Sequence, residues 1–219
     1  NYSYPDGNKI RPVPPIKTAL GGLMIIGAYP SARFEKRRSK GTNRYRLIPI
    51  ADNLQPLGQE EYFDGVSIRT LSSADGLSKY YLSSLGLTAE KCWITDLVKV
   101  FLYKESHIDS CTDVVPGFYA VETRTRFKEL GSKSLSWINT EIEICKPRLV
   151  ITLGLEVAQV ISGNSHGSAD SLLTLHIDYP VSIGSLPTLY CPHPEACRRY
   201  PKWHDHLNKQ LMEIQKHKK

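Results

Sequence analysis

Three apolar stretches of this 219-residue chain carry, at or near their ends, side chains that can do chemistry. Tyr29 ends the first stretch, Asp96 lies within the second, and His193 follows the third by two residues. A neutral phenol can position a water molecule, and a carboxylate accepts hydrogen bonds. An imidazole can stabilise negative charge that builds up in a reaction. These three residues are therefore the first candidates for a functional site.

Two of them also have a purely structural interpretation. Asp96 can bind Lys99 or the N-terminus of a helix, and the sequence supports this structural role and a functional role equally. His193 can be a histidine that is merely hydrogen-bonded at the end of a strand, although its neighbour Pro194 favours function.

The cysteines and histidines argue against a metal site or a disulfide framework. Five cysteines are widely spaced and form no CxxC pair, which is typical of reduced thiols. A group of possible zinc ligands lies near the C-terminus, but we expect Cys191 to point along a strand and Cys197 into a helix face. The group comprises Cys191, His193, Cys197, His204 and His206. We therefore expect no metal and no cofactor.

Positive charge is concentrated in one short segment. The range 33–46 holds seven basic residues and one acid, so this segment alone equals the chain's net charge of +6. Because Phe34 and Tyr45 are interleaved with the charges, the segment can hold a phosphate backbone and stack on bases. A solvated loop explains the charges equally well. The basic residues are Arg33, Lys36, Arg37, Arg38, Lys40, Arg44 and Arg46.

The order of apolar runs predicts the elements that must position these side chains. Four β-like runs alternate with segments long enough for helices, which favours a parallel sheet covered on both faces. The runs are 23–29, 92–98, 148–153 and 188–191, and the expected helices are 74–87, 135–145, 156–161 and 201–216. We therefore predict an α/β fold, a three-layer α/β/α sandwich with a central four-stranded parallel sheet. Ligands of such sheets bind at the carboxyl ends of the strands, where three of the four turns look chemical and the turn at Gly154 looks structural.

The chain is expected to form one domain over residues 1–219. Residues 1–15 contain four prolines and are expected to lie on the surface, and residues 33–65 form a basic insertion. The apolar runs are too short to cross a bilayer, so we expect a cytoplasmic protein without membrane contact. We expect a monomer.

Four motifs at these positions resemble, in order, those of the uracil-DNA glycosylase superfamily. The first resembles a strand that ends in Gly-x-x-Pro, and the second resembles the TN-x-VK strand of the iron-sulfur members. The third resembles their KP-x-x-V-x-x-LG step, and the fourth resembles HP-S-x-x-x-R. The motifs are IIGAYPS at 25–31, WITDLVK at 93–99, KPRLVITLG at 146–154, and HP at 193–194 with Arg199. Motif order is closest to that of the iron-sulfur members.

The resemblance assigns expected roles to individual residues. Gly27 and Asp96 would bind an extruded base, and Phe63 or Tyr29 would stack on it, although Phe63 can equally be packing under a loop. His193 would stabilise the departing base. Phosphate contacts would come from the basic insertion and the second motif, through Arg37, Arg38, Arg44, Arg46 and Arg199.

The chain departs from the family at three places. Family members carry Asp, Asn or Glu one or two residues after the first-motif glycine, whereas this chain has Ala28 and Tyr29. Asp96 stands where an amide is usual, and an ionised carboxylate accepts hydrogen bonds but cannot donate to uracil O4. Val100 stands where iron-sulfur members have a cysteine, and the early cysteines are missing too, so that cluster is absent.

The expected function is that of a DNA glycosylase-like protein. It would bind an extruded base in single- or double-stranded DNA, damaged or modified, and hydrolyse the N-glycosidic bond. The alternative is a catalytically inactive module of the same fold that binds nucleic acid, a nucleotide or a base. The missing first-motif carboxylate supports this alternative.

Overall fold

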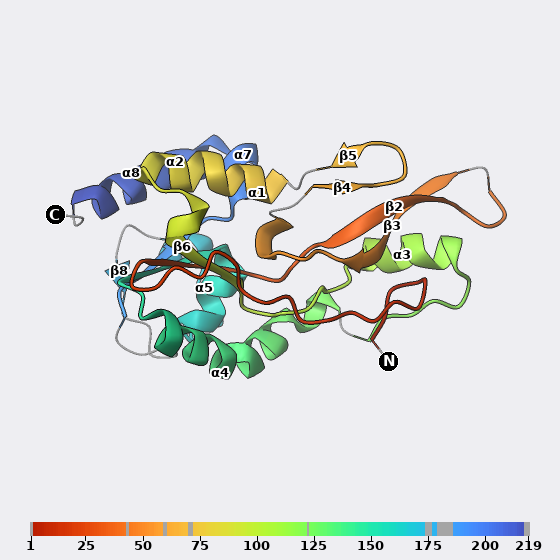
Figure 1. Ribbon diagram of the computed structural model, residues 1–219, viewed down its shortest axis with the longest axis horizontal. Coiled ribbons are helices and arrows are strands. Elements are labelled where there is room, and N and C mark those ends of the chain that lie inside the picture. The colour runs from red at the N-terminus through yellow and green to blue at the C-terminus, as the bar shows by residue number, and fades with distance from the viewer. Residues whose placement is uncertain are drawn as a thin grey trace.

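The structure is a computed structural model that describes residues 2–42, 44–58, 61–69, 72–121, 123–173, 177–178 and 186–216. A twisted sheet lies at its centre (Figure 1). Four strands run parallel in the order β6-β1-β7-β9, and a two-residue strand, β8 (Ile177–Asp178), pairs antiparallel with β9. The parallel strands are β1 (Leu23–Gly27), β6 (Cys92–Asp96), β7 (Leu149–Leu153) and β9 (Thr188–Cys191). The predicted four-stranded parallel sheet is confirmed, with β8 as an additional edge strand.

Helices cover both faces of the sheet. Met24 and Ile26 of β1 point to one face, where α4 (Phe127–Cys145), α5 (Leu155–Ile161) and α6 (Ala169–Leu172) pack. Leu23 and Ile25 point to the opposite face. The helices of that face are α1 (Ser72–Gly76), the π-helix η2 (Leu77–Leu82), α2 (Ser83–Leu85), α7 (Pro194–Arg199) and α8 (Pro201–Lys216). Alternate side chains of β1 thus pack into two separate cores, one on each face of the sheet, as a three-layer sandwich requires.

A third core lies beside the sheet and is built around the basic segment. This segment is not a loop, because β2 (Ala32–Arg38) and β3 (Tyr45–Asp52) form an antiparallel hairpin with an irregularity between Arg33 and Phe34. Helix α3 (Glu105–Val114) packs on β3, and their shared core contains Ile48, Phe101, Tyr103 and Cys111. A second, shorter hairpin follows, formed by β4 (Tyr62–Phe63) and β5 (Ile68–Arg69). Both hairpins project to one side of the sheet (Figure 1).

The remaining elements are three single turns of 3-10 helix. They are η1 (Pro56–Gly58), η3 (Ala89–Lys91) and η4 (Arg124–Arg126). Within η1, Leu57 has a left-handed backbone with φ of 56° and is buried. A residue with a side chain rarely adopts this conformation, so packing around Leu57 must hold it there.

The first residues of the chain lie against the molecule. Tyr4 is buried in the third core and donates a hydrogen bond from its hydroxyl to Asp52 at 2.8 Å. Residues 13–19, which we call the edge segment, run along the outer edge of β6. Backbone hydrogen bonds join Ile16 to Ile94 in both directions, at 2.9 and 3.0 Å, and Val13 to Lys99 at 2.8 Å. Within the described ranges, no helix is long and apolar enough to cross a membrane.

Candidate active site

A cavity of about 820 Å³ lies at the carboxyl ends of β1, β7 and β9. Such positions are where open parallel sheets bind ligands. Two groups among its lining residues form opposite kinds of wall. The sheet-edge wall consists of Ala28, Tyr29, Leu153, Gly154 and His193, and the aromatic wall consists of Phe34, Phe101, Lys104 and His107. Tyr29 and His193 both line this cavity.

His193 is held at the N-terminus of α7. Its ring Nδ1 accepts a hydrogen bond from the Glu195 backbone amide at 3.1 Å, so His193 caps the helix. The preceding loop is fixed by Tyr81, whose hydroxyl donates to the Pro192 carbonyl. Gly154, at the end of β7, has a φ of 98° and packs beside the His193 side chain. A glycine is needed there because other residues rarely adopt this backbone conformation.

The environment of His193 keeps its imidazole neutral. Burial, together with the nearby Arg124 and Lys104, lowers the pKa of His193 to about 4, although Glu195 opposes the shift. Because Nδ1 accepts a hydrogen bond, the single proton of the neutral ring belongs on Nε2. His193 is therefore a neutral hydrogen-bond donor at the cavity.

Tyr29 is fixed by an arginine that sequence reasoning missed. Arg124 donates from Nη1 to the Tyr29 hydroxyl at 2.8 Å and also forms an ion pair with Glu156. The Tyr29 ring packs beside Phe127, with 6.1 Å between centroids. Burial raises the pKa of Tyr29, although Arg124 opposes this, so the phenol is protonated at neutral pH. Glu156, beside Gly154, brings a carboxylate to the cavity from the turn that the sequence suggested was only structural.

Gly27 and Asp96 do not line the cavity. They are neighbours across β1 and β6, and a side chain on Gly27 would clash with the Asp96 carboxylate, because its Cβ would lie 2.2 Å from Oδ1. Leu57 does line the cavity, and one of its methyl groups would lie 3.0 Å from the same Cβ. Leu57 therefore packs over the step between Gly27 and Asp96 on its cavity side.

Asp96 is 1% exposed, and neither carboxylate oxygen makes a hydrogen bond to any described residue. Burial raises the pKa of Asp96 to about 7. Lys99 and the nearby Leu57 amide favour the charged form, so they limit the rise in the pKa but do not cancel it. At neutral pH a large share of Asp96 is a carboxylic acid, which donates as well as accepts. The expectation of an acceptor-only carboxylate therefore applies only to the charged fraction of Asp96.

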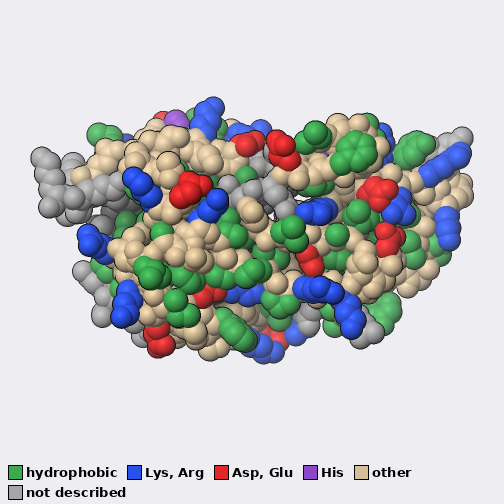
Figure 2. Space-filling view, viewed as in Figure 1, with side chains coloured by type: hydrophobic (Ala, Val, Ile, Leu, Met, Phe, Trp, Pro, Cys, Tyr) green, Lys and Arg blue, Asp and Glu red, His purple; other side chains and the backbone are tan. Residues whose placement is uncertain are grey.

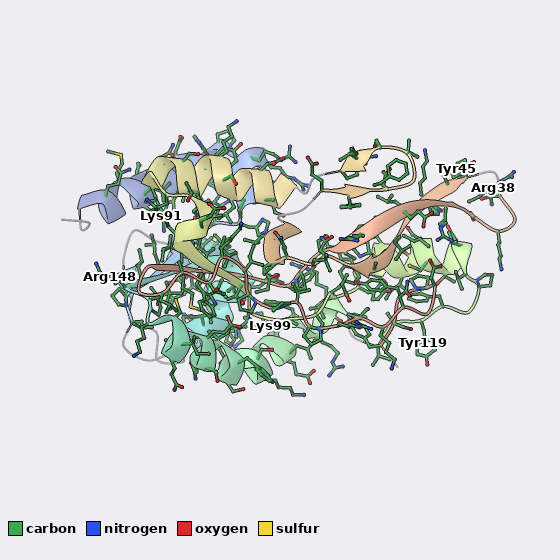
Figure 3. The ribbon with its side chains drawn as sticks, in the orientation of Figure 1. Arg38, Tyr45, Lys91, Lys99, Tyr119 and Arg148 are labelled. Atoms are coloured by element: carbon green, nitrogen blue, oxygen red, sulfur yellow. The ribbon has the colours of Figure 1, made fainter. Side chains whose placement is uncertain are left out.

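Lys99 is engaged elsewhere. Its ammonium group contacts Glu141 of α4 at 2.5 Å and also donates to the Thr95 hydroxyl, on the α4 side of the sheet (Figure 3). Trp93 donates to the same glutamate at 3.1 Å. The structural alternative in which Asp96 bonds to Lys99 is thus not what the structure contains.

Phe63 lies on β4 and is 66% exposed, outside the lining of the cavity. The aromatic rings at the cavity are Phe34 and Phe101, which belong to the third core. Phe101 follows β6 by five residues, too far for the rule about strand ends to select it. The resemblance could not align Phe63 securely because the insertion before it is long.

The predicted backbone-binding arginines fall into two groups. Arg37 forms ion pairs with Asp6 and Glu35, at 3.0 and 2.7 Å, and Arg46 pairs with Asp113 at 2.6 Å. Arg38 and Arg44 are exposed near the tip of the β2–β3 hairpin, where the side chains of Arg38 and Tyr45 lie close together (Figure 3). Lys and Arg side chains are visible at this end of the molecule, and also at the opposite end and along the lower edge (Figure 2). Arg199 lines the cavity, where it lies 3.5 Å from Glu195.

Metal ligands do not gather anywhere in the part of the chain that the structure describes, where no three His, Cys, Asp or Glu residues are placed to share an ion. All five cysteines are buried free thiols.

Comparison with known proteins gives one family. The sequence pattern of the uracil DNA glycosylase superfamily matches residues 21–215, which span β1 to nearly the end of α8. No curated protein matches the chain significantly.

Proposed function

The chain belongs to the uracil DNA glycosylase superfamily, and from this premise we propose that it binds a base extruded from DNA and hydrolyses its N-glycosidic bond. The observation that carries the proposal is His193, a neutral imidazole fixed at the N-terminus of α7 and facing the cavity. Family membership accounts for the fold, and His193 supplies a hydrogen-bond donor for the negative charge that develops on the leaving base.

In the proposed reaction, the bond between the sugar and the base breaks and the base leaves with the electron pair. The Nε2–H of His193 donates to the base oxygen that becomes negative. A water molecule then adds to the sugar carbon and releases its proton to solvent. A neutral imidazole suits this role because its Nε2–H donates to the developing anion while the buried ring stays uncharged.

Tyr29 takes the place nearest to the missing first-motif carboxylate. Its protonated hydroxyl, held by Arg124, positions the water but does not deprotonate it. The acids at the cavity, Glu156 and Glu195, are each paired with arginines. We therefore expect hydrolysis to depend on stabilisation of the leaving base and to be slow.

Base recognition is assigned to Asp96 and Gly27, provided that Leu57 moves aside when the base enters. A protonated Asp96 presents one donor and one acceptor, as an amide does, and so accommodates uracil O4. Stacking would come from Tyr29 or from Phe34, which lines the cavity, in preference to Phe63, which does not. Arg199 and the hairpin residues Arg38 and Arg44, which are exposed, would contact phosphates, and the less exposed Arg37 and Arg46 would contribute less.

The test is an excision assay on duplex and single-stranded oligonucleotides that carry one uracil, one hypoxanthine or no altered base. Abasic product is revealed by alkaline cleavage. We expect slow release of a base by the natural protein and loss of release in His193→Asn, because asparagine still caps a helix but lacks the imidazole. Equal product from both proteins would contradict the role of His193.

The second candidate function is binding without hydrolysis. The observation in its favour is that neither Ala28 nor Tyr29 is a base and that the nearby carboxylates are ion-paired. In that case the assay gives no abasic product on any oligonucleotide, while DNA with an extrudable base is still bound more tightly than intact duplex.

A further inference from the structure

A second histidine faces the cavity from the aromatic wall. His107 is the third residue of α3, and its Nδ1 accepts a hydrogen bond from the Lys104 backbone amide at 3.3 Å. Its ring lies nearly parallel to Phe101, with 5.7 Å and 20° between them, and meets Phe34 at 5.2 Å in an edge-on arrangement. Three contacts therefore fix the orientation of this ring.

His107 and His193 are held in the same way. In each ring Nδ1 accepts from a backbone amide at the N-terminus of a helix, from the N-cap residue Lys104 in the case of His107 and from Glu195 in the case of His193, and in each the proton belongs on Nε2. Burial lowers the pKa of His107 to about 4, with Lys104 adding to the shift, so this ring is neutral as well. The hydrogen bond that fixes each ring is made by Nδ1, and both histidines line the cavity.

Lys104 shows that the two rings share one space. It lines the cavity, and its charge contributes to lowering the pKa of both histidines, so it lies near each. Phe34 and Phe101 make the surroundings of His107 flat and apolar, which suits a base more than a phosphate.

We propose that His107 donates a hydrogen bond from Nε2 to the base held in the cavity, as a second contact in addition to that of His193. This inference rests on the proposed function, because it concerns the same bound base. Two neutral N–H donors on different walls require a base with acceptors on two edges. A pyrimidine with two carbonyl oxygens, such as uracil, meets this requirement better than cytosine, whose amine replaces one of them.

The test compares binding of a duplex that carries one uracil nucleotide made non-hydrolysable by 2′-fluorination with binding of the unmodified duplex. His107→Phe keeps the ring between Phe34 and Phe101 but removes the donor, whereas His107→Gln keeps a donor. His166→Gln changes an exposed histidine away from the cavity and is the matched control. Melting temperatures verify that each variant is folded.

We expect His107→Phe to weaken binding of the uracil analogue by about fivefold to tenfold, the effect of one hydrogen bond, with no change for unmodified DNA. His107→Gln should recover part of the loss, and His166→Gln should behave like the natural protein. An equal loss on unmodified DNA would place His107 on the backbone and overturn the proposal. An unchanged affinity for the analogue would overturn it as well.

A second readout separates this inference from the proposed function. In protein labelled with ¹⁵N-histidine, the Nε2 signal of His107, assigned by its absence in His107→Phe, should shift when free uracil is added and shift less with cytosine. If the natural protein neither excises a base nor prefers the analogue, the proposed function fails, and the shift alone decides on His107. A signal that does not move then overturns this inference too.

Discussion

The two walls of the cavity are built in different ways. The sheet-edge wall is backbone geometry: strands end, a glycine turns the chain, and a helix begins at His193. The aromatic wall is side-chain packing, in which Phe34, Phe101 and His107 hold one another in a core separate from both faces of the sheet. The first kind of wall positions groups that every reaction of the fold needs. We therefore expect the contact of His193 with the leaving base to depend on the first wall, and the additional contact of His107 with the base to depend on the second.

Replacing His193 should have the largest effect and is the sharpest test of this division. We expect His193→Asn to lower the excision rate by about 100-fold to 1,000-fold, which is the usual cost of losing one donor to a developing negative charge. Affinity for unmodified DNA should not change. The measurement is single-turnover excision alongside binding by fluorescence anisotropy. A rate reduced no more than by His107→Phe would remove the distinction between the walls.

The second prediction concerns Asp96, which lies buried behind the sheet-edge wall, and the pH dependence of the protein's stability. Its pKa of about 7 in the folded protein lies above the ordinary value of 3.8, so the folded state binds more protons between these pH values. Stability is thus lost as pH rises through this window. We expect Asp96→Asn to raise the free energy of unfolding at pH 8 by on the order of 4 kcal/mol, and to leave it unchanged below about pH 4. Urea unfolding at the two pH values measures this.

The control for Asp96 is Asp109→Asn, which changes an exposed carboxylate on α3. A gain that is the same for both variants, or that persists at low pH, would show that Asp96 is not a buried acid. Asp96→Asn should also strengthen binding of the uracil analogue at pH 8, where the natural carboxylate is charged, more than at pH 6.

The hairpin beside the aromatic wall is expected to contribute a moderate, salt-dependent share of DNA affinity. Replacing Arg38 and Arg44 by glutamine should reduce the slope of log affinity against log salt by about 2, one for each phosphate that is no longer neutralised. The matched control removes two charges at the other end of the molecule, Lys91 and Arg148, which directly precede β6 and β7. It should leave the slope unchanged (Figure 3). If both double variants alter the slope equally, the charge acts as a general field and the hairpin is not a contact surface.

Tyr29→Phe should have the smallest effect. The variant loses the hydrogen bond from Arg124 and the hydroxyl that positions water, but it keeps the ring beside Phe127. We expect excision to slow by about fivefold to tenfold, because the neutral hydrogen bond between the hydroxyl and the water is worth about 1 kcal/mol. DNA binding should stay the same. A rate loss as large as that of His193→Asn would instead make Tyr29 the main group of the reaction.

The sheet could be predicted because its strands are short apolar runs that both cores need. Helix α4 was harder, since it begins at Phe127, eight residues before the predicted start. Its first turns contain Gly131, a poor helix former, and this glycine lets the helix approach Leu97, which a Cβ would meet at 3.1 Å. The β2–β3 hairpin was hidden because its solvent-facing charges dominate the pattern.

The candidate site could be predicted only where strands end. His193 and Tyr29 follow directly from this rule, whereas Arg124 and His107 belong to segments that reach the cavity through tertiary packing. The position of Leu57 has no signal at all, because its left-handed backbone is imposed by neighbours that are remote in the sequence. Asp96 was placed in the right strand, but its burial under Leu57, and hence its protonation, required coordinates.

The edge segment, finally, has a consequence for how this protein behaves at high concentration. An outer strand of a sheet presents a row of unpaired amides and carbonyls, on which a strand from another molecule can add. Residues 13–19 occupy part of that row on β6, through Ile16 and its neighbours, although none of them lines the cavity. The short stretch thereby covers part of an edge on which a strand from another molecule could add, so loss of these backbone contacts would favour aggregation.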